Sequence, residues 1–326
     1  MNPINVGIIG TGRHGARYAN HIINDLDCFR LTAISRRSLV GLDQAAQWNA
    51  DWHGEWRDLI SDPRVEAIIA ATPPNLNLEI AKACSTAQKP LLIEKPLAIN
   101  TTEAEQIVNL FSSNNTPLTV GHTLRYNATI KALKHELPKA GELYSFYTNQ
   151  RLEKALHRWL DDENIAGGGV ILHTAVHMFD ALRFVTGREI TRVRASMFCR
   201  DNTKLENLFT AQIEMEKNLV GTMDASKVGP ARAGRYEFVG SKGQLQGDQV
   251  HGFMEFIKEA TITQLPHAKQ VSTIVPLLKD WHKFLQGKGP NPIPGEDGLA
   301  AVRICDACRQ SALEDKWVSI IDGLGS

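Results

Sequence analysis

Hydrophobic and polar positions alternate along the first part of the chain as expected of repeated strand and helix units. Short apolar runs, typical of buried strands, are separated by longer stretches with helical periodicity. Strands are predicted over 5–10, 30–35, 65–71, 91–94 and 117–120, and helices over 16–24, 78–87 and 101–112. The last of these helices has Thr101 or Thr102 as its expected N-cap. Regular alternation of this kind predicts a parallel, doubly wound sheet.

The pattern changes after residue 123. A helix over 128–137 leads into a strand over 143–151, and short runs with strand character follow in close succession. These runs are 190–199, 209–216, 219–226, 236–240, 243–247 and 261–264, and a terminal helix is predicted over about 296–314. Closely spaced strands are typical of an antiparallel sheet.

Two domains follow from these patterns, and the fold class is α/β. A doubly wound domain over 1–123 precedes an α+β domain over 124–326 with a large open, mainly antiparallel sheet. The terminal helix is a candidate to pack back on the first domain.

Composition and charge exclude several classes of function. The chain has 326 residues, enough for two domains, with 43% hydrophobic and 22% charged residues as in ordinary globular proteins. Lys+Arg and Asp+Glu are equal at 36 each, so no overall field favours nucleic acid or an acidic membrane as a partner. We see no signal peptide, and no apolar stretch near the ~18 residues of a membrane span. The 5 dispersed cysteines predict reduced thiols in a cytoplasmic protein.

The first predicted strand runs directly into the sequence Gly10-Thr11-Gly12-Arg13-His14-Gly15. This G-x-G-x-x-G pattern between a strand and a helix is typical of a dinucleotide-binding loop. The first glycine permits a tight turn, the second lets the backbone approach a pyrophosphate, and the third allows close helix packing. We therefore predict a Rossmann domain that binds NAD or NADP.

The sequence after the second predicted strand, Ser35-Arg36-Arg37-Ser38, bears on which dinucleotide binds. An acid at position 36 would bind the ribose 2′-hydroxyl of NAD. Arg36 and its neighbours supply instead a guanidinium and hydroxyl groups, which suit a 2′-phosphate. The prediction is NADP as the cofactor; the alternative is a solvated basic turn that tolerates NAD.

Two further strands end at chemically informative residues, Thr72-Pro73 and Glu94-Lys95-Pro96. A lysine at the end of a buried parallel strand is unusual, because such a strand is covered on both faces. Ligands of open α/β sheets bind outside the carboxyl ends of the strands. Thr72, Pro73, Glu94 and Lys95 are therefore expected to join the cofactor site, with Lys95 pointing into the crevice.

Three glycines, 167–169, precede a predicted helix that carries His173 and His177. Residues four apart share one face of an α-helix, and Asp180 lies on roughly the same face. Two histidines beside an acid and a glycine-rich entry favour a catalytic site over two core histidines. The same spacing can hold zinc, but the motif lacks the glutamate of a zinc-protease helix, so metal is the lesser alternative.

In this order, the motifs resemble those of the glucose–fructose oxidoreductase/inositol dehydrogenase (Gfo/Idh/MocA) family of NAD(P)-dependent oxidoreductases. The resemblance covers almost the whole chain and rests on 10–15, 71–74, 94–96, 167–169 with His177 and Asp180, 240–243 and 294–298. It implies that Lys95 contacts the reacting oxygen and that His177 is the acid/base candidate. It also implies an often cis proline after the lysine, and a homodimer or homotetramer formed through the open sheet.

Three positions depart from the family pattern, and one of them is Ala175, where many members carry a glycine. Many members carry an aspartate at the position of His173, which acts with the later histidine in proton handling. A carboxylate there would accept a hydrogen bond from His177, whereas a neutral imidazole accepts more weakly and a charged one repels. Asn77 also stands where a histidine is expected.

The predicted reaction is the oxidation of a secondary alcohol or the reverse reduction, in which the cofactor carries the hydride. Lys95 is expected to stabilise the oxygen, His177 to transfer the proton, and His173 to position the substrate or assist. By resemblance the substrate is a sugar, cyclitol or related polyol. Arg125, Tyr126 and Trp159 are candidates to line its pocket.

Two other functions remain open at this point. Some relatives use a retained cofactor for transient oxidation and then cleave a glycosidic bond, and the His173 departure leaves room for that chemistry. A non-catalytic NAD(P)-sensing regulatory protein is a further alternative. The presence of Lys95 and His177 argues against a sensor, which needs no proton-transfer pair.

Overall fold

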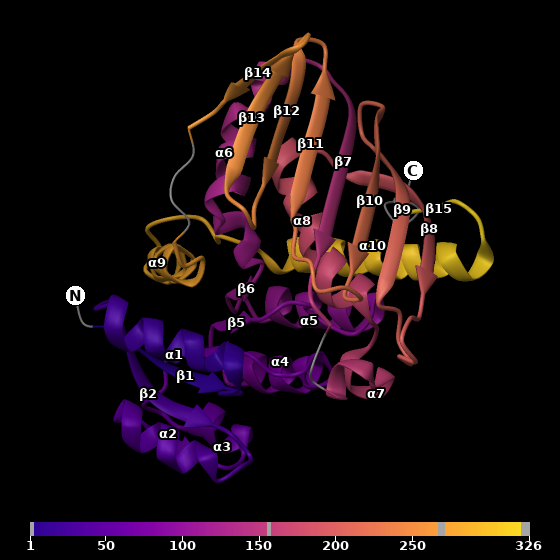
Figure 1. Ribbon diagram of the computed structural model, residues 1–326. Coiled ribbons are helices and arrows are strands. Elements are labelled where there is room, and N and C mark those ends of the chain that lie inside the picture. Colours follow the sequence, from indigo (N-terminus) through magenta and orange to yellow (C-terminus); the bar gives the residue numbers. More distant parts are fainter. Residues whose placement is uncertain (1–2, 155–157, 267–270, 321–326) are drawn as a thin grey trace. The chain divides into compact units, whose positions relative to one another are not determined.

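The computed structural model describes residues 3–154, 158–266 and 271–320, and the chain divides into two compact units (Figure 1). Unit 1 comprises 1–123 and 272–299, and unit 2 comprises 124–271 and 300–326. The sequence predicts 272–299 as part of the second domain, but the structure places it in unit 1. The reason is backbone pairing with the edge of the parallel sheet, where the N–H of Val120 donates to the carbonyl of Ile293 at 2.9 Å.

Unit 1 is built on a 6-stranded parallel sheet in the order β3-β2-β1-β4-β5-β6. The strands are β1 (Ile4–Ile9), β2 (Phe29–Ser35), β3 (Asp51–His53), β4 (Ala67–Ala70), β5 (Leu91–Ile93) and β6 (Leu118–Val120). The helices are α1 (Arg13–Asp25), α2 (Val40–Trp48), α3 (Trp56–Ser61), η1 (Pro74–Leu76), α4 (Asn77–Thr86), α5 (Thr101–Ser113) and α9 (Ile274–Leu285). Every residue of β4, β5 and β6 is buried, as expected of parallel strands covered on both faces.

The strand order of unit 1 reverses between β1 and β4, which is where a doubly wound sheet forms its ligand crevice. In-register pairing of β1 with β4 and of β4 with β5 brings the carboxyl ends of the three strands to one edge. Hydrogen bonds extend this pairing past the strand ends, from the N–H of Ala71 to Ile9 (2.9 Å) and from the N–H of Glu94 to Ala70 (2.8 Å). The glycine loop, Thr72 and Glu94 therefore begin at the same edge.

The N-cap of α5 differs from the prediction of Thr101 or Thr102. The cap is Asn100, whose side-chain oxygen accepts from the N–H of Glu103 at 2.9 Å. Asparagine is as good an N-cap as any residue, and it stands one position earlier, which leaves both threonines inside the helix.

Unit 2 contains a 9-stranded sheet in the order β14-β13-β12-β11-β7-β10-β9-β8-β15. All neighbouring pairs are antiparallel except β10 with β7, which confirms the predicted open, mainly antiparallel sheet. The strands are β7 (Leu143–Arg151), β8 (Ile190–Phe198), β9 (Leu208–Met215), β10 (Leu219–Ser226), β11 (Arg235–Gly240), β12 (Gly243–Asp248), β13 (Phe253–Lys258), β14 (Thr261–Gln264) and β15 (Val318–Ser319).

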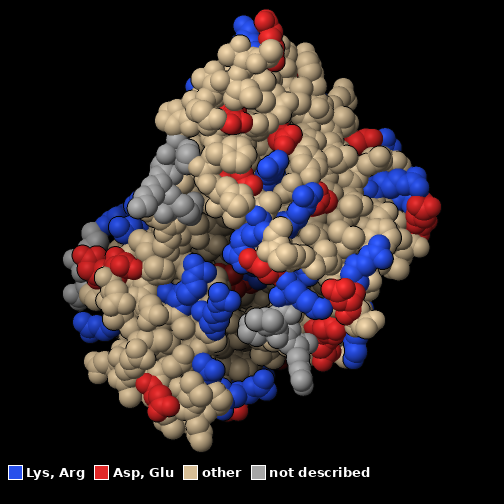
Figure 2. Space-filling view, viewed as in Figure 1, with Lys and Arg blue, Asp and Glu red and all other residues tan. Residues whose placement is uncertain are grey.

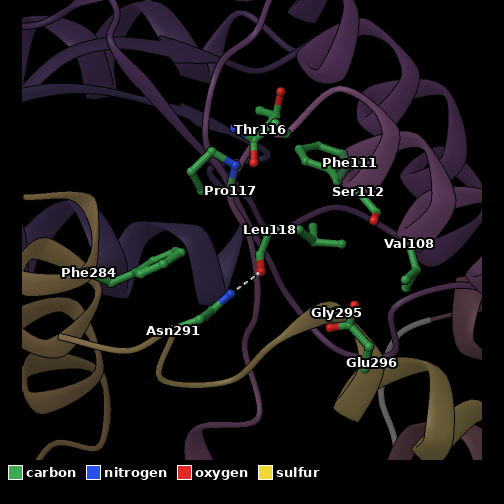
Figure 3. Close-up of a pocket in the computed structure, with 11 residues that line it drawn as sticks. Val108, Phe111, Ser112, Thr116, Pro117, Leu118, Phe284, Asn291, Gly295 and Glu296 are labelled. Carbon is green, nitrogen blue, oxygen red and sulfur yellow. Dashed lines mark hydrogen bonds between the residues drawn. The ribbon is translucent and has the colours of Figure 1, made fainter. Parts of the chain in front are cut away.

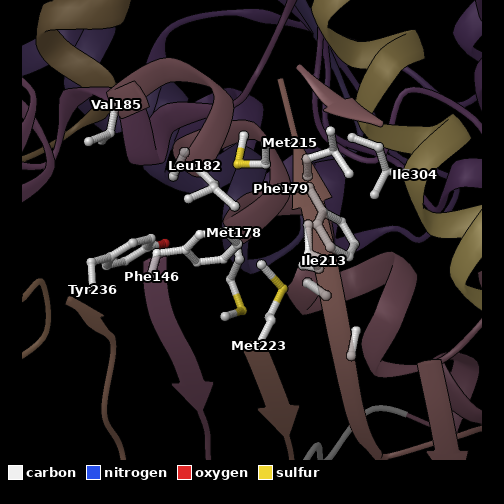
Figure 4. Close-up of a cluster of buried hydrophobic side chains, with 14 of the residues drawn as sticks. Phe146, Met178, Phe179, Leu182, Val185, Ile213, Met215, Met223, Tyr236 and Ile304 are labelled. Atoms are coloured by element: carbon white, nitrogen blue, oxygen red, sulfur yellow. The ribbon is translucent and has the colours of Figure 1, made fainter. Parts of the chain in front are cut away.

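The second part of the chain also contains helical segments. They are η2 (Thr123–Tyr126), α6 (Ala128–Glu136), η3 (Leu137–Ala140), η4 (Arg158–Asp161), α7 (Glu163–Ala166), η5 (Ile171–Ala175), α8 (Val176–Thr186) and α10 (Gly295–Glu314). In unit 2, α6 contacts β12 and β13, and α8 contacts β7. Figure 4 shows the resulting core, in which Met178 and Phe179 of α8 meet Phe146 of β7 and Ile213 of β9.

The opposite face of this sheet is open. Along β9 exposed and buried residues alternate, as expected of a sheet covered on one side. Figure 2 looks onto this face, where side chains of both charges are intermingled and the surface over β11–β14 carries few charged groups. Val220 and Val239 are exposed here to 45% and 38%.

One helical stretch in unit 2, Glu163–Thr186, is long and apolar enough to cross a membrane by length and composition, which the sequence did not predict. Its most apolar window is 83% buried inside the structure. The stretch contains η5 and α8, whose apolar residues form the core of unit 2, and this burial explains its hydropathy.

Candidate cofactor and active site

The glycine loop has the geometry that close approach of a ligand requires. Gly10 has φ +87, and a Cβ on it would lie 2.6 Å from the carbonyl oxygen of Ala71. A Cβ on Gly15 would lie 2.0 Å from the carbonyl oxygen of Gly10, so helix α1 can pack against the loop only at a glycine. At Gly12, by contrast, a Cβ would meet nothing within 4 Å, so the space beside this residue is open. The loop therefore fits a pyrophosphate approaching Gly12, with α1 directly behind it.

Residues 35–38 lie at the end of β2, beside this loop. Ser35 is buried, Arg36 is half-buried, and Arg37 and Ser38 are exposed. The guanidinium of Arg36 donates from Nε to the Ser38 hydroxyl at 2.9 Å and from Nη1 to the carbonyl of Thr11 at 2.8 Å. Arg36 thus contacts the glycine loop directly, across 25 residues of sequence.

Glu94 ties the glycine loop to the end of β5. Its Oε1 accepts a hydrogen bond from the Tyr18 hydroxyl at 2.5 Å and another from Nε2 of His14 at 2.8 Å. Burial alone would raise the pKa of Glu94, but the charge and hydrogen bond of His14 and the bond from Tyr18 outweigh it and lower the pKa. Burial and the Glu94 charge raise the pKa of Tyr18. Glu94 is therefore a carboxylate held in place by its side chain, and this holds the chain directly before Lys95.

Asn77 fixes the residues after Lys95. Its side-chain Nδ2 donates to the carbonyls of Pro96 at 3.0 Å and Leu97 at 3.2 Å, and its Oδ1 accepts from the Thr72 hydroxyl at 3.2 Å. Asn77 is buried, with 2% exposure, and the Lys95–Pro96 peptide bond is cis. The sequence identified Asn77 only as a departure from the family pattern. The structure shows that it joins the Thr72 loop to the lysine segment.

The glycine-rich entry to the histidine helix in unit 2 is held by an acid that the sequence did not identify. Glu206 Oε1 accepts from the N–H groups of Gly169 at 2.9 Å and Ile171 at 3.2 Å. A Cβ on Gly169 would lie 1.9 Å from the Glu206 carbonyl oxygen, so only glycine fits. Burial raises the pKa of Glu206. Nothing in the sequence near Glu206 signals this role, because its partners are 35 and 37 residues away.

His173 lies in η5, which is a π-helical turn, and His177 lies in the first turn of α8. A π turn closes with i→i+5 hydrogen bonds and often marks a functional site, and the spacing through it is not that of an α-helix. His173 is 9% exposed, and its Nε2 donates to the carbonyl of Ala166 at 2.9 Å. The ring of Trp159 meets the His173 ring edge-on, with centroids 5.7 Å apart. His177 is half-buried.

Asp180 forms an ion pair with Arg125 that the sequence did not predict. The guanidinium donates from Nη2 to Oδ1 at 2.6 Å and from Nε to Oδ2 at 2.9 Å. Side-chain exposure is 0% for Asp180 and 11% for Arg125, so this bidentate pair is buried. Tyr126 is also buried, with the Lys131 ammonium 4.6 Å from its ring centroid. Two of the residues expected to line a substrate pocket thus have contacts inside unit 2.

Two matching family models decide what kind of protein this is. The model described as an oxidoreductase family with an NAD-binding Rossmann fold matches residues 4–122, and the model of the GFO/IDH/MocA C-terminal domain matches residues 138–246. The chain belongs to the Gfo/Idh/MocA family. The resemblance stated from the motifs is thereby confirmed, as is the predicted fold.

Relatives of this Gfo/Idh/MocA protein extend over its full length. It is 24% identical to myo-inositol 2-dehydrogenase of Thermotoga maritima, over 98% of this chain and 99% of the relative. It is 21% identical to the NADP(+) scyllo-inositol 2-dehydrogenase IolW of Bacillus subtilis, over 98% of this chain and 97% of the relative. A solved structure of levoglucosan dehydrogenase with NADH and levoglucosan superposes with a TM-score of 0.88 at 20% identity, covering 98% of this chain and 100% of that chain. The protein is therefore an NAD(P)-dependent dehydrogenase or reductase.

A hollow of about 290 Å³ in unit 2 lies beside His173. Charged and amide side chains contribute much of its lining, namely Lys154, Asp161, Asp201, Asn202, Glu206, Asn207 and Lys227. This mixture of donors and acceptors suits a ligand with several hydroxyl groups.

A second hollow lies in unit 1 between α5, β6 and the segment 284–296, with a volume of about 480 Å³ (Figure 3). Asn291 in its wall donates to the carbonyl of Leu118 at 2.7 Å, which is the dashed line in Figure 3. This side chain thus hydrogen-bonds to β6 at the edge of the sheet. None of the predicted site residues lines this hollow.

For the zinc alternative, the described part of the chain contains no group of three or more His, Cys, Asp or Glu residues placed to hold a metal ion.

Proposed function

We propose that the protein transfers a hydride between NADP and a secondary alcohol or ketone of a sugar, cyclitol or related polyol. The observation that carries this proposal is the double anchoring of Lys95: Glu94 fixes the chain before it and Asn77 fixes the chain after it. Both anchors reach to neighbours of the glycine loop at the switch point of the sheet. A lysine held this way is preorganised to act on a ligand at the carboxyl edge. Preorganised charge aimed at the reacting atoms contributes strongly to catalysis.

The proposed proton handling belongs to Lys95 and His177. When bound beside the glycine loop, a nicotinamide cofactor would supply the hydride chemistry. Lys95 stabilises the negative charge that develops on the substrate oxygen, and its ammonium relays a proton. His177 accepts the proton of the alcohol in oxidation and returns it in reduction.

His173 takes a different role from the aspartate that many family members carry. Its Nε2–H donates to the Ala166 carbonyl, which holds the ring in place. An imidazole, unlike a carboxylate, carries no negative charge to hold a protonated partner, so a larger share of the proton handling is proposed for Lys95. We propose that His173 positions the substrate from the wall of the 290 Å³ hollow.

The substrate class rests on this hollow and on the inositol dehydrogenases among the relatives. The carboxylates and ammonium groups in its lining can bind adjacent hydroxyl groups as acceptors and donors. Trp159, whose ring meets His173, is proposed to pack against the apolar face of the sugar ring. Arg125 and Tyr126 are proposed to support the pocket from behind through their buried contacts.

Asn77 is expected to matter for turnover more than for cofactor binding. In Asn77→Ala the carbonyls of Pro96 and Leu97 lose their donor, and small displacements of a catalytic group cost up to about 10²-fold. We expect kcat to fall by roughly 10–100-fold with little change in the KM for NADPH. Glu79→Ala, an exposed change on the same helix, serves as the control. Unchanged kcat in Asn77→Ala would mean that the lysine segment does not depend on this side chain.

We also propose that the protein forms homodimers or homotetramers through the open face of the unit 2 sheet. Its proposed location is the cytoplasm. The exposed Val220 lies on β10 and the exposed Val239 on β11, the two strands that flank β7. Both supply apolar contacts on that face. Analytical ultracentrifugation should show a dimer or larger species that Val220→Lys shifts toward monomer. A wild-type monomer at micromolar concentration contradicts this assembly.

The experiment that tests the proposed function is a screen of polyols, sugars and ketosugars with NADP and NAD, followed by the absorbance of the reduced cofactor. Turnover of a polyol or ketosugar, faster with NADP, supports the proposal. Cofactor that stays bound while a glycoside is cleaved favours the retained-cofactor alternative. Tight binding without any turnover favours a sensor.

A further inference from the structure

We propose that Gln44 of α2 is a positioning residue for cofactor specificity, which holds the guanidinium of Arg36 ready for the 2′-phosphate of NADP. This inference rests on the NADP preference proposed above and names the part of the fold that enforces it. Gln44 was not among the residues that the glycine motif or the basic turn pointed to.

A closed ring of hydrogen bonds joins Gln44, Thr11 and Arg36. Gln44 Oε1 accepts from the Thr11 hydroxyl at 2.7 Å and from Arg36 Nη1 at 3.1 Å. Gln44 Nε2 donates to the Thr11 carbonyl at 3.1 Å, and that carbonyl also accepts from Arg36 Nη1 at 2.8 Å. Thr11 has no exposed surface, so the ring is seated on the glycine loop itself. The amide of Gln44 therefore contacts both the loop and the guanidinium.

The backbone of Arg36 is also held by a hydrogen bond. Trp52 of β3 donates from its indole nitrogen to the Arg36 carbonyl at 3.0 Å. A Cβ on Gly41, in the first turn of α2, would lie 2.3 Å from that indole nitrogen. Glycine at position 41 therefore lets α2 approach closely enough for Gln44 to reach Arg36. Main chain and side chain of Arg36 are both held before any ligand arrives.

The hydrogen bonds of Arg36 leave one side of its guanidinium for a ligand. The guanidinium has five N–H groups. Nε donates to Ser38, and Nη1 donates to Thr11 and Gln44. Nη2 makes no hydrogen bond to any residue that the structure describes. A phosphate can accept from Nη2 as a dianion, whereas the 2′-hydroxyl of NAD offers no charge, so preorganising Arg36 favours NADP over NAD.

The test is cofactor binding to the full chain without substrate, measured by calorimetry with NADPH and NADH. Gln44→Ala removes one of the two acceptors of Arg36 Nη1 and leaves the Thr11 carbonyl. We expect the Kd for NADPH to rise about tenfold, while that for NADH changes less than about twofold. Gln47→Ala, an exposed change on the same helix, is the matched control and should alter neither Kd. Gln44→Glu keeps the size and the acceptor for Arg36 but adds a negative charge, so NADPH should weaken more than in Gln44→Ala.

The outcomes separate the inference from the proposals beneath it. Wild-type protein that prefers NADPH, with the same preference in Gln44→Ala and Gln44→Glu, overturns the role of Gln44 and leaves the NADP proposal standing. Equal wild-type affinity for both cofactors overturns the NADP proposal together with the inference, and leaves the hydride-transfer proposal to the substrate screen. Thermal denaturation of each variant shows whether the fold is kept. In Gln44→Glu, tighter NADPH binding would also overturn the inference.

Discussion

Replacing Lys95 by alanine is expected to lower kcat by about 10²–10⁴-fold, the range for losing a group that assists proton transfer. The reason is geometric as well as electrostatic. Glu94 and Asn77 hold the backbone on both sides of Lys95. Because this segment cannot shift easily, it cannot bring another side chain into the place of the missing ammonium. Cofactor affinity should change far less, because the glycine loop and Arg36 remain. Steady-state kinetics with the best polyol, together with NADPH binding by calorimetry, measures both effects.

The matched control is Lys82→Ala, which removes an exposed lysine of α4 that pairs with Glu79. It should leave kcat unchanged. Near-normal turnover in Lys95→Ala, with cofactor bound, would mean that Lys95 is not the group that handles the substrate oxygen.

His177→Ala should lower kcat in the same way, with His135→Ala as the control because His135 is exposed on α6. Residues that act together in one reaction show strongly non-additive losses. The double variant should therefore lose much less than the product of the two single losses. Full additivity would indicate that Lys95 and His177 act independently.

The largest effect on stability is expected from Arg125→Leu. This change leaves Asp180, which has no exposed surface, without its bidentate partner. Removing one member of a buried ion pair typically costs about 3–5 kcal/mol of unfolding free energy. Chemical denaturation should show a lower midpoint with an unchanged slope. Arg125→Lys should recover only part of the loss, because an ammonium cannot form both hydrogen bonds.

Arg232→Leu is the control, since it removes one member of a surface pair with Glu153 and should leave the midpoint nearly unchanged. The double variant Arg125→Leu/Asp180→Leu should be more stable than Arg125→Leu alone, because the Asp180 carboxylate no longer stays buried without its arginine. A stability for Arg125→Leu close to that of wild type would contradict the buried pair.

Elements with a strong local pattern could be predicted from the sequence, and weakly patterned ones could not. The strands β1, β2 and β5 are apolar runs next to glycine or a charged residue, and their bounds came out within two residues. The strand β3 (Asp51–His53) escaped notice because its residues are exposed or half-buried and show no apolar alternation. The helix α9 (Ile274–Leu285) was missed although it buries Trp281, since a proline in its first turn interrupts the pattern without disrupting the helix.

The candidate site divides along the same line. Gly10, Gly12 and Gly15 act through the backbone of one short motif, so the motif alone predicts their roles. The partners of Glu94 lie 76 and 80 residues away, and the partner of Asp180 lies 55 residues away. Contacts over such distances depend on how strands and helices pack, which one sequence does not reveal. Asn77 and Gln44 belong to this second group, and each has a test above.

Deuterium placed on the carbinol carbon of the best polyol tests the central claim most directly. With wild-type protein and NADP, the deuterium should appear in released NADPH in an amount equal to the ketone formed, and Lys95→Ala should slow this transfer without changing its destination. Deuterium that returns to a released product, with no net formation of NADPH, would contradict the proposed dehydrogenase and point to transient oxidation by a retained cofactor.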